Sequence, residues 1–366
     1  MDYNNKRFDE IVNNINYLLR DQSLSASDRN MLILQRNSIY EISRKKTIVS
    51  YRKESFSWML KQLNKKMKSE IKKIGIKNLY YFSFIIENII NKKEDYQVAF
   101  EKSIDSKDVI NHVISFYKEV DIESYNIINS ILKYPKKIYN ISNDPKTIDS
   151  CIFKRFYKYP VVNIKNTNNY EMCVKLVHEM QHQVSYVINE RIGYNYKKIN
   201  HLLVECTPMF FELLYCDYLN KQGLNNSDVM SLYKRRQKSI DESVSRAKLY
   251  IDLLCKYCDK VTPLTISDLE NFYSLSNDRL FTNLSYLLGY DILSDMKYIL
   301  SYLKSVEINS VYTFDKKEAM GIIKYINRLE LYDYDFSKIN KQGIIIGKFP
   351  VQSDYYNKHI QKILNK

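Results

Sequence analysis

Residues 159–191 read YPVVNIKNTNNYEMCVKLVHEMQHQVSYVINER, and this stretch decides what kind of fold the chain adopts. Its first part, Tyr159–Ile164, is short and β-prone, which predicts a strand with Pro160 confined to an edge position. An asparagine-rich turn follows over residues 166–169, and the spacing of apolar residues then predicts a helix over residues 170–191. We therefore expect one short strand to lead directly into one long helix.

This helix contains a His-Glu-x-x-His pattern formed by His178, Glu179 and His182. Residues four apart on a helix share a face, so both imidazoles can bind one metal ion. Glu179 then lies beside the open coordination position, where it can hold and deprotonate a water molecule. Two neutral imidazoles suit zinc, so we expect one Zn²⁺ per chain. The alternative is a helix that carries two histidines without a metal.

A catalytic zinc site needs a third protein ligand, and Glu205 is the candidate. It follows His182 by 23 residues, enough for the first helix to end and a second helix to return past the metal. Glu212 lies two turns beyond Glu205 on the same helical face, where it can accept a hydrogen bond from a zinc-binding histidine. Asp217 is a weaker rival for the third ligand.

The rest of the chain reads as mostly helical. Glycine (7) and proline (6) are scarce, which favours long helices with few breaks. The pattern changes near residue 149, where Cys151–Phe156 predicts a second strand beside the first. A further helical segment is expected over Arg279–Leu303. We therefore predict a mainly α fold with one small sheet beside the metal-binding helix, divided into an N-terminal helical lobe (1–145) and a catalytic region (146–366).

The charge of the chain does not by itself indicate a function. Lys and Arg number 56 against 42 Asp and Glu, which gives a net charge of +14. Such a balance can indicate nucleic-acid binding. The lysines are spread along the chain without a recognised nucleic-acid motif, so solvated helix faces are the preferred interpretation. A basic helical nucleic-acid-associated protein with a fortuitous motif remains an alternative.

Targeting signals and cysteine usage point to the cytoplasm. No charge-free apolar stretch of about 18 residues is present, so no membrane span is expected. The polar N-terminal sequence lacks the apolar core of a signal peptide. The six cysteines have no framework spacing and are expected to be reduced thiols. Cys255 and Cys258 fall within a helical pattern, which favours ordinary helix residues over a zinc or redox pair.

The stretch Cys151–Leu219 resembles the catalytic core of the oligopeptidase F and thimet oligopeptidase family of zinc metallopeptidases. In that family a strand ending in Pro-apolar-apolar-Asn, here Pro160–Asn163, precedes the His-Glu-x-x-His helix. A glutamate follows about 25 residues later and another seven residues after that, which match Glu205 and Glu212. The resemblance implies a zinc ion bound by His178, His182 and Glu205, with Glu179 as general base and acid.

The resemblance extends to a C-terminal tyrosine segment. The family places tyrosines there that stabilise the negatively charged oxygen of the tetrahedral intermediate, and Arg279–Tyr290 resembles that segment. Tyr286 and Tyr290 are the residues to which the role would fall, because a phenol can donate to a developing oxyanion. The chain departs from the family at Gln181, where glycine is usual, and at Ser185, where histidine is common.

These observations predict a zinc metalloendopeptidase that acts on oligopeptides or unfolded segments. An extended peptide would pair with the main chain of Val161, Val162 and Asn163, on the expectation that this strand is at the sheet edge. By analogy with the family, helices of the N-terminal lobe would wall the cleft. A non-catalytic relative that binds peptides or regulates other proteins is the alternative within the same fold. The sequence makes no prediction of oligomeric state.

Overall fold

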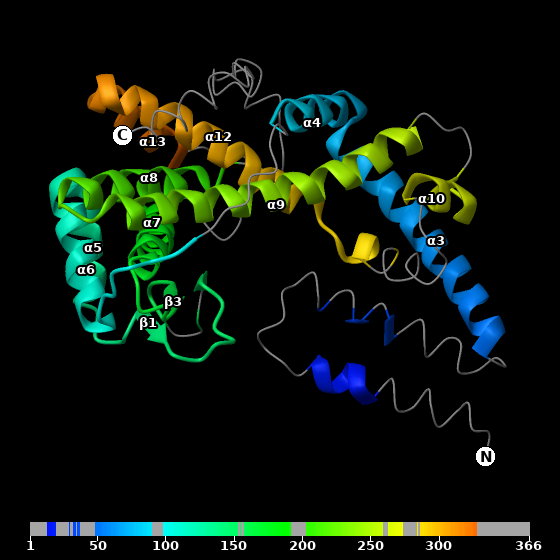
Figure 1. The fold of residues 1–366 in the computed structure, drawn as a ribbon, viewed down its shortest axis with the longest axis horizontal. Helices are drawn as coiled ribbons and strands as arrows, with labels where there is room; N and C mark the ends of the chain where they lie inside the picture. Colours follow the sequence, from blue (N-terminus) through cyan, green and yellow to red (C-terminus); the bar gives the residue numbers. More distant parts are fainter. Residues whose placement is uncertain are drawn as a thin grey trace. The chain divides into compact units, whose positions relative to one another are not determined.

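The computed structural model describes residues 13–19, 29, 32–33, 35–36, 48–89, 98–152, 154, 157–191, 203–258, 263–273, 284 and 286–327 (Figure 1). Within these residues the chain is mainly α-helical with one small β-sheet, which confirms the predicted fold class. No helix in this part of the chain is long and apolar enough to cross a membrane.

The chain divides into two compact units, each made from two separate stretches. Unit 1 comprises Met1–Glu87 and Arg246–Ile292, and unit 2 comprises Asn88–Ser245 and Leu293–Lys366. The His-Glu-x-x-His helix lies in unit 2. The division into lobes at residue 145 stays a prediction.

Unit 2 is built around one buried helix. Its helices are α5 (Ser106–Val120), α6 (Ile122–Leu132), α7 (Glu171–Arg191), α8 (Cys206–Lys221), the first part of α9 (Asn226–Cys258), α12 (Ile292–Phe314) and α13 (Lys316–Asn327). Helices α5, α6, α8 and α13 all pack against α7, and Figure 1 shows α8 on one side of it and strands β1 and β3 on the other. Most side chains of α7 are buried as a result.

Aromatic side chains pack α5 against α8, two helices that both contact α7. Phe116 and Tyr117 of α5 contact Phe211 of α8 with ring centroids 6.4 and 5.7 Å apart. Large rings contribute much of the buried area in such a core. The hydroxyl of Tyr117 also donates to the backbone carbonyl of Val177 at 2.9 Å, one residue before the first histidine of the motif, and so ties α5 to α7.

The sheet has three strands in the order β1-β3-β2: β1 (Tyr139–Ser142), β2 (Ser150–Ile152) and β3 (Val161–Lys165). β1 runs parallel to β3, and β2 runs antiparallel to it. The expectation that Val161–Ile164 forms an edge strand is wrong, because β3 is paired on both sides. The reason is β1, a polar four-residue strand between the end of the helical pattern near Tyr139 and the predicted strands, where the sequence predicted no element.

A polar turn sets the start of α7, as predicted. Asn168 adopts a left-handed conformation with φ of 53°, which asparagine tolerates better than most residues. The side chain of Asn169 accepts a hydrogen bond from the backbone N–H of Glu171 at 2.9 Å. An asparagine in this position satisfies one of the free N–H groups at a helix start. Behind the turn, Gln183 of α7 donates to the carbonyl of Pro160 at 2.8 Å and ties the helix to the sheet.

Unit 1 is also helical. It contains α3 (Ile48–Ile74), most of α4 (Ile76–Ile89), the second part of α9 and α10 (Ile266–Tyr273). Gly75 separates α3 from α4 with φ of 84°, a conformation that glycine adopts without strain. Asn64 of α3 pairs with the backbone of Leu264 through two hydrogen bonds of 3.1 and 3.0 Å.

Two further expectations can be compared with the structure. In the described part of the predicted helical segment Arg279–Leu303, residues 284, 286–289 and 292–303 are helical, and the helix is interrupted only at Tyr290 and Asp291, before α12 begins at Ile292. Residues 279–283 and 285 lie outside the described residues. None of the six cysteines forms a disulfide. Cys255 and Cys258 both lie on α9, as expected for ordinary helix residues.

Candidate metal centre

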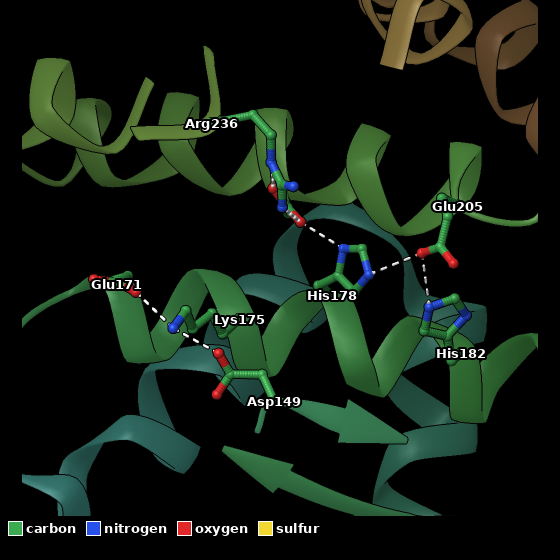
Figure 2. A network of polar contacts seen from close by, with 8 residues as sticks. Asp149, Glu171, Lys175, His178, His182, Glu205 and Arg236 are labelled. Atoms are coloured by element: carbon green, nitrogen blue, oxygen red, sulfur yellow. Dashed lines mark hydrogen bonds and ion pairs between the residues drawn. The ribbon is translucent and has the colours of Figure 1, made fainter. Parts of the chain in front are cut away.

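Helix α7 presents the two histidines of the motif on one face. His178 and His182 are one turn apart, and their ring centroids lie 5.0 Å from each other (Figure 2). His178 is buried, whereas the side chain of His182 is 15% exposed. The pair therefore lies at the boundary between the core of unit 2 and its surface.

Glu205 completes the group from the start of α8. Its Oε2 atom lies 3.1 Å from Nε2 of His178 and 3.2 Å from Nε2 of His182. Glu205 occupies the N-cap position of α8, yet its side chain does not cap that helix and is directed at the imidazoles instead. The ligand atoms of the three residues all lie within 4.8 Å of one another. The structure thus brings together the three predicted ligands.

The spacing and charge of these atoms fit a divalent cation. Two atoms that each lie about 2.1 Å from a tetrahedral zinc ion are about 3.4 Å apart, close to the nitrogen–oxygen distances found here. Burial opposes charge on His178, but Glu212 and Glu205 raise the pKa of its imidazole to about 10. Burial likewise opposes ionisation of Glu205, yet His182 and His178 hold the pKa of its carboxyl well below the usual range. The carboxylates of Glu205 and Glu212 therefore favour a positive charge at the imidazole of His178.

Glu212 supports His178 from behind. On α8, its Oε1 atom lies 2.5 Å from Nδ1 of His178, and the residue is only 3% exposed. Burial would raise the pKa of Glu212, but Arg236 and His178 lower it, so the carboxylate form is favoured. With Nδ1–H donated to this carboxylate, Nε2 of His178 is the nitrogen that would face a metal once the ion displaces its proton. The contact with His178 is the one expected of Glu212 from the sequence, and its role at a metal site stays a prediction.

Glu179 is close to the group but is not one of its ligands. It follows His178 directly on α7 and is 9% exposed. Burial raises the pKa of its carboxyl, and the two histidines oppose that shift only in part. A carboxyl with a raised pKa is a stronger base than an ordinary glutamate, which suits general acid–base chemistry.

The competing residues of the motif region have other partners. Asp217, the rival third ligand, accepts a hydrogen bond from the hydroxyl of Tyr233 at 2.9 Å. Gln181, where the family usually has glycine, is buried and accepts from the hydroxyl of Tyr117 at 3.3 Å. Ser185 donates to the side chain of Asn327 on α13 at 3.0 Å.

The predicted substrate-binding and tyrosine residues stay predictions. The backbones of Val161, Val162 and Asn163 pair with neighbouring strands, so none of them offers the free sheet edge that was expected. The rings of Tyr286 and Tyr290 stack with centroids 5.6 Å apart. Both tyrosines belong to unit 1, whereas the histidine–glutamate group belongs to unit 2.

Three residues near the group were not predicted from the sequence. Arg236 of α9 donates through Nε to Oε2 of Glu212 at 2.7 Å and through Nη2 to its Oε1. Lys297 of α12 places Nζ 3.3 Å from Oε1 of Glu205. Glu205 and burial also raise the pKa of the neighbouring Tyr298. Arg236 and Lys297 come from helices distant in sequence, and no local pattern marks them.

A second polar cluster lies at the start of α7. Glu171 forms ion pairs with Lys175 at 2.6 Å and with Arg235 of α9, and Lys175 also contacts Asp149 at 2.6 Å (Figure 2). Two carboxylates and two cations therefore neutralise one another here. Unlike the histidine–glutamate group, this cluster contains no imidazole and leaves no demand for a further cation.

Comparisons with known proteins identify the fold. No protein-family model matches the sequence, and the search of curated proteins found no relative. Among solved structures, the chain is similar to a "putative peptidase from Chlamydophila abortus" with a TM-score of 0.55 and 13% identity over 95% of this chain. It is also similar to a "putative oligoendopeptidase F" from Bacillus anthracis str. Ames, with a TM-score of 0.50 and 12% identity over 92% of this chain.

A second structure described as oligoendopeptidase F matches with a TM-score of 0.51 and 12% identity over 93% of this chain. The chain spans only 62 to 64% of the length of these three structures. At such low identity the likeness establishes the fold. The fold is that of oligoendopeptidase F-like peptidases, as the sequence resemblance led us to expect.

Proposed function

We propose that this chain is a zinc-dependent metallopeptidase that hydrolyses peptide bonds in oligopeptides or unfolded segments. The observation that carries the proposal is the convergence of His178, His182 and Glu205 on one point, with Glu179 beside them. The oligoendopeptidase F-like fold supports the same activity. Because function is determined by the site rather than by the fold, the side-chain geometry carries more weight.

Two imidazoles and one carboxylate form a donor set that zinc accepts, with a fourth position left for water or substrate. Zn²⁺ bound there would supply a Lewis acid for the scissile carbonyl and lower the pKa of water. Cysteine thiolates are absent from the group, so a purely structural four-cysteine site is not the better explanation. We therefore assign His178, His182 and Glu205 as ligands.

The chain's own residues then carry the proton. Glu179 accepts a proton from the attacking water, and the same carboxyl passes it to the nitrogen of the leaving amine. This transfer leaves Glu179 ionised at the end of the reaction, ready for the next cycle. Glu212 holds His178 in one tautomer throughout, because its carboxylate accepts from Nδ1. Tyr286 and Tyr290 remain the candidates for donors to the oxyanion.

Strand β2 is the better candidate for contact with an extended peptide. It pairs with β3 on one side only within the described sheet, so its other edge can add a strand. Cys151 of β2 is close enough to Glu179 and Glu205 for both carboxyls to raise its pKa, after burial itself. A peptide on β2 would therefore lie beside the proposed general base. Val161, Val162 and Asn163 would act indirectly by supporting β2.

Peptide-library cleavage tests the proposal. We expect the wild-type chain to cleave peptides, a chelator to abolish cleavage, and Glu179→Gln to lower the rate by about 10²- to 10⁴-fold. The variant should keep the metal content of the wild type, because Glu179 is not a ligand. Glu190→Gln is the matched control, since Glu190 is an exposed glutamate on the same helix and should keep full activity.

The same experiment separates the non-catalytic alternative. A peptide-binding or regulatory relative would bind peptides and metal without cleaving either library or unfolded substrates. Wild-type protein that contains zinc and cleaves nothing would favour that alternative. Equal cleavage by wild type and Glu179→Gln would mean that the general base is assigned to the wrong residue.

A further inference from the structure

Arg236 holds the carboxylate that supports His178. Its Nε atom donates to Oε2 of Glu212 at 2.7 Å and its Nη2 atom donates to Oε1, so the guanidinium grips both oxygens. A planar guanidinium that pairs in this two-point manner fixes the plane of a carboxylate as well as its position. A single ammonium in its place would hold the carboxylate of Glu212 at one point and leave its plane free to rotate.

The carboxylate in turn orients the imidazole. Oε1 of Glu212 is shared between Nη2 of Arg236 and Nδ1 of His178, which lies 2.5 Å away. A rotation of the carboxylate would move that oxygen and tilt the imidazole with it. Nε2 on the far side of the ring lies 3.1 Å from Oε2 of Glu205. The contacts therefore form one chain from the guanidinium to the proposed metal position.

An adjacent arginine shows what a purely structural pair looks like in this molecule. Arg235 also pairs with a buried glutamate, Glu171, but that glutamate contacts a lysine and no histidine. Glu171 lies two helical turns before His178 on α7. Two adjacent arginines of α9 thus have different surroundings. Arg235 belongs to an ion-pair cluster, whereas Arg236 is linked through Glu212 to the proposed metal ligand His178.

We propose that Arg236 is a positioning residue of the metal site, which acts through Glu212 to hold His178 in the orientation that binds the metal. The inference rests on the proposed assignment of His178, His182 and Glu205 as ligands. Arg236 of α9 thus stands behind Glu212, which itself stands behind the proposed ligand His178. The inference concerns metal binding, so it does not require that the chain cleave peptides.

A cavity beside the pair makes the proposal testable by chemical rescue. A space of about 540 Å³ within unit 2 is bordered by Arg236, Glu212, Leu213 and Tyr233. Truncation of Arg236 to alanine would enlarge this space beside Glu212, which already borders it. A guanidinium ion has the same planar donors as the lost side chain and is small enough to enter. Urea has a similar size and shape without the charge.

The experiment measures affinity for Zn²⁺ and Co²⁺ by competition with a chromogenic chelator. We expect Arg236→Ala to bind about tenfold more weakly than wild type, at the lower end of the effect of residues that orient metal ligands. Guanidinium, at concentrations far below those that unfold proteins, should restore most of that loss, and urea should not. The visible absorption bands of bound Co²⁺ should shift in the variant and return with guanidinium.

Arg235→Ala is the matched control, because it removes the neighbouring arginine and its ion pair. It should keep wild-type metal affinity and show no response to guanidinium. Equal losses in Arg235→Ala and Arg236→Ala, or wild-type affinity in Arg236→Ala, would overturn the proposal. Thermal unfolding of each variant identifies any general loss of structure.

Arg236→Lys covers the case in which the alanine variant does not fold. It keeps the charge but cannot grip both oxygens, so we expect a smaller loss of affinity and a shifted Co²⁺ spectrum. Wild-type affinity together with a wild-type spectrum in Arg236→Lys would overturn the proposal. Peptide cleavage by the wild type is scored separately. Protein that binds zinc and cleaves no peptide would contradict the proposed peptidase while leaving the role of Arg236 intact.

Discussion

The first turn of α7 and its middle are built from similar parts and reach different results. In both regions a nearly fully buried glutamate meets an arginine of α9, Glu171 with Arg235 and Glu212 with Arg236. In the first turn, the other contact of the glutamate is the ammonium of Lys175. In the middle, it is an imidazole.

That single difference decides whether the cluster is complete. At the first turn, Glu171 and Asp149 balance Lys175 and Arg235. In the middle, the carboxylates of Glu179, Glu205 and Glu212 face the cations of Arg236 and Lys297, and the remaining charge is balanced only while His178 holds a proton. Unlike an ammonium, an imidazole can exchange that proton for a metal ion, which would keep the buried carboxylates compensated. The imidazole is thus what makes this cluster a candidate metal site.

Loss of a proposed metal ligand should have the largest effect on metal affinity. His182→Ala removes one of three donors, and a zinc site of four ligands binds with about 10–16 kcal/mol, or roughly 3 kcal/mol for each ligand. We therefore expect metal affinity to fall by about a hundredfold or more, as measured by chelator competition. His112→Ala is the control, because His112 contacts the ring of Tyr170 and lies outside the group. Equal losses in the two variants would contradict the assignment.

The second prediction is that loss of the charge of Glu171 lowers the free energy of unfolding and leaves metal affinity unchanged. Glu171→Gln removes the charge at the centre of the ion-pair cluster, but Lys175 and Arg235 are 22% and 48% exposed and can be solvated. We expect the free energy of unfolding to fall by about 1–3 kcal/mol, as measured by urea denaturation. Metal affinity should change by less than about twofold.

Glu212→Gln, unlike Glu171→Gln, should change metal affinity. It should weaken metal binding by about 10- to 100-fold, because it removes the acceptor that orients His178. If Glu171→Gln weakened metal binding as strongly, the two clusters would not be separate in function. The distinction between a complete and an incomplete cluster would then fail.

Much of the centre could be predicted from the sequence because its geometry is local. The helical repeat places His178 and His182 on one face, and it places Glu212 two turns beyond Glu205. Glu212 lies within the apolar run Met209–Tyr215, where a carboxylate without a partner would be costly, so the sequence itself makes it a candidate. Only the approach of α8 to α7 remained to be supplied by the fold.

The remaining features depend on contacts between distant segments. Arg236 lies in a long charged helix, where nothing in the sequence distinguishes it from Arg235. The central place of β3 depends on β1, whose four residues carry too little apolar pattern to predict a strand. The break before α12 falls where helical spacing continues through Tyr290 and Asp291. In each case tertiary packing overrides a weak local preference.

The smallest expected effect concerns the ammonium of Lys297, which lies 3.3 Å from Oε1 of Glu205. Two influences on metal affinity oppose each other here. The ammonium repels a metal cation, and it also holds one oxygen of a ligand. Oε2, the oxygen that we propose binds the metal, is already held by two imidazoles at 3.1 and 3.2 Å, so we expect repulsion to dominate.

Lys297→Met should therefore bind Zn²⁺ more tightly than wild type, by less than about tenfold, because a partly exposed charge contributes at most about 1 kcal/mol. Chelator competition measures the change. Lys324→Met is the control, since Lys324 pairs with Glu123 on the surface and should leave the affinity unaltered. A weaker affinity in Lys297→Met would show that Glu205 depends on this lysine for its position. Helix α12 would then help to position the histidine–glutamate group through Lys297.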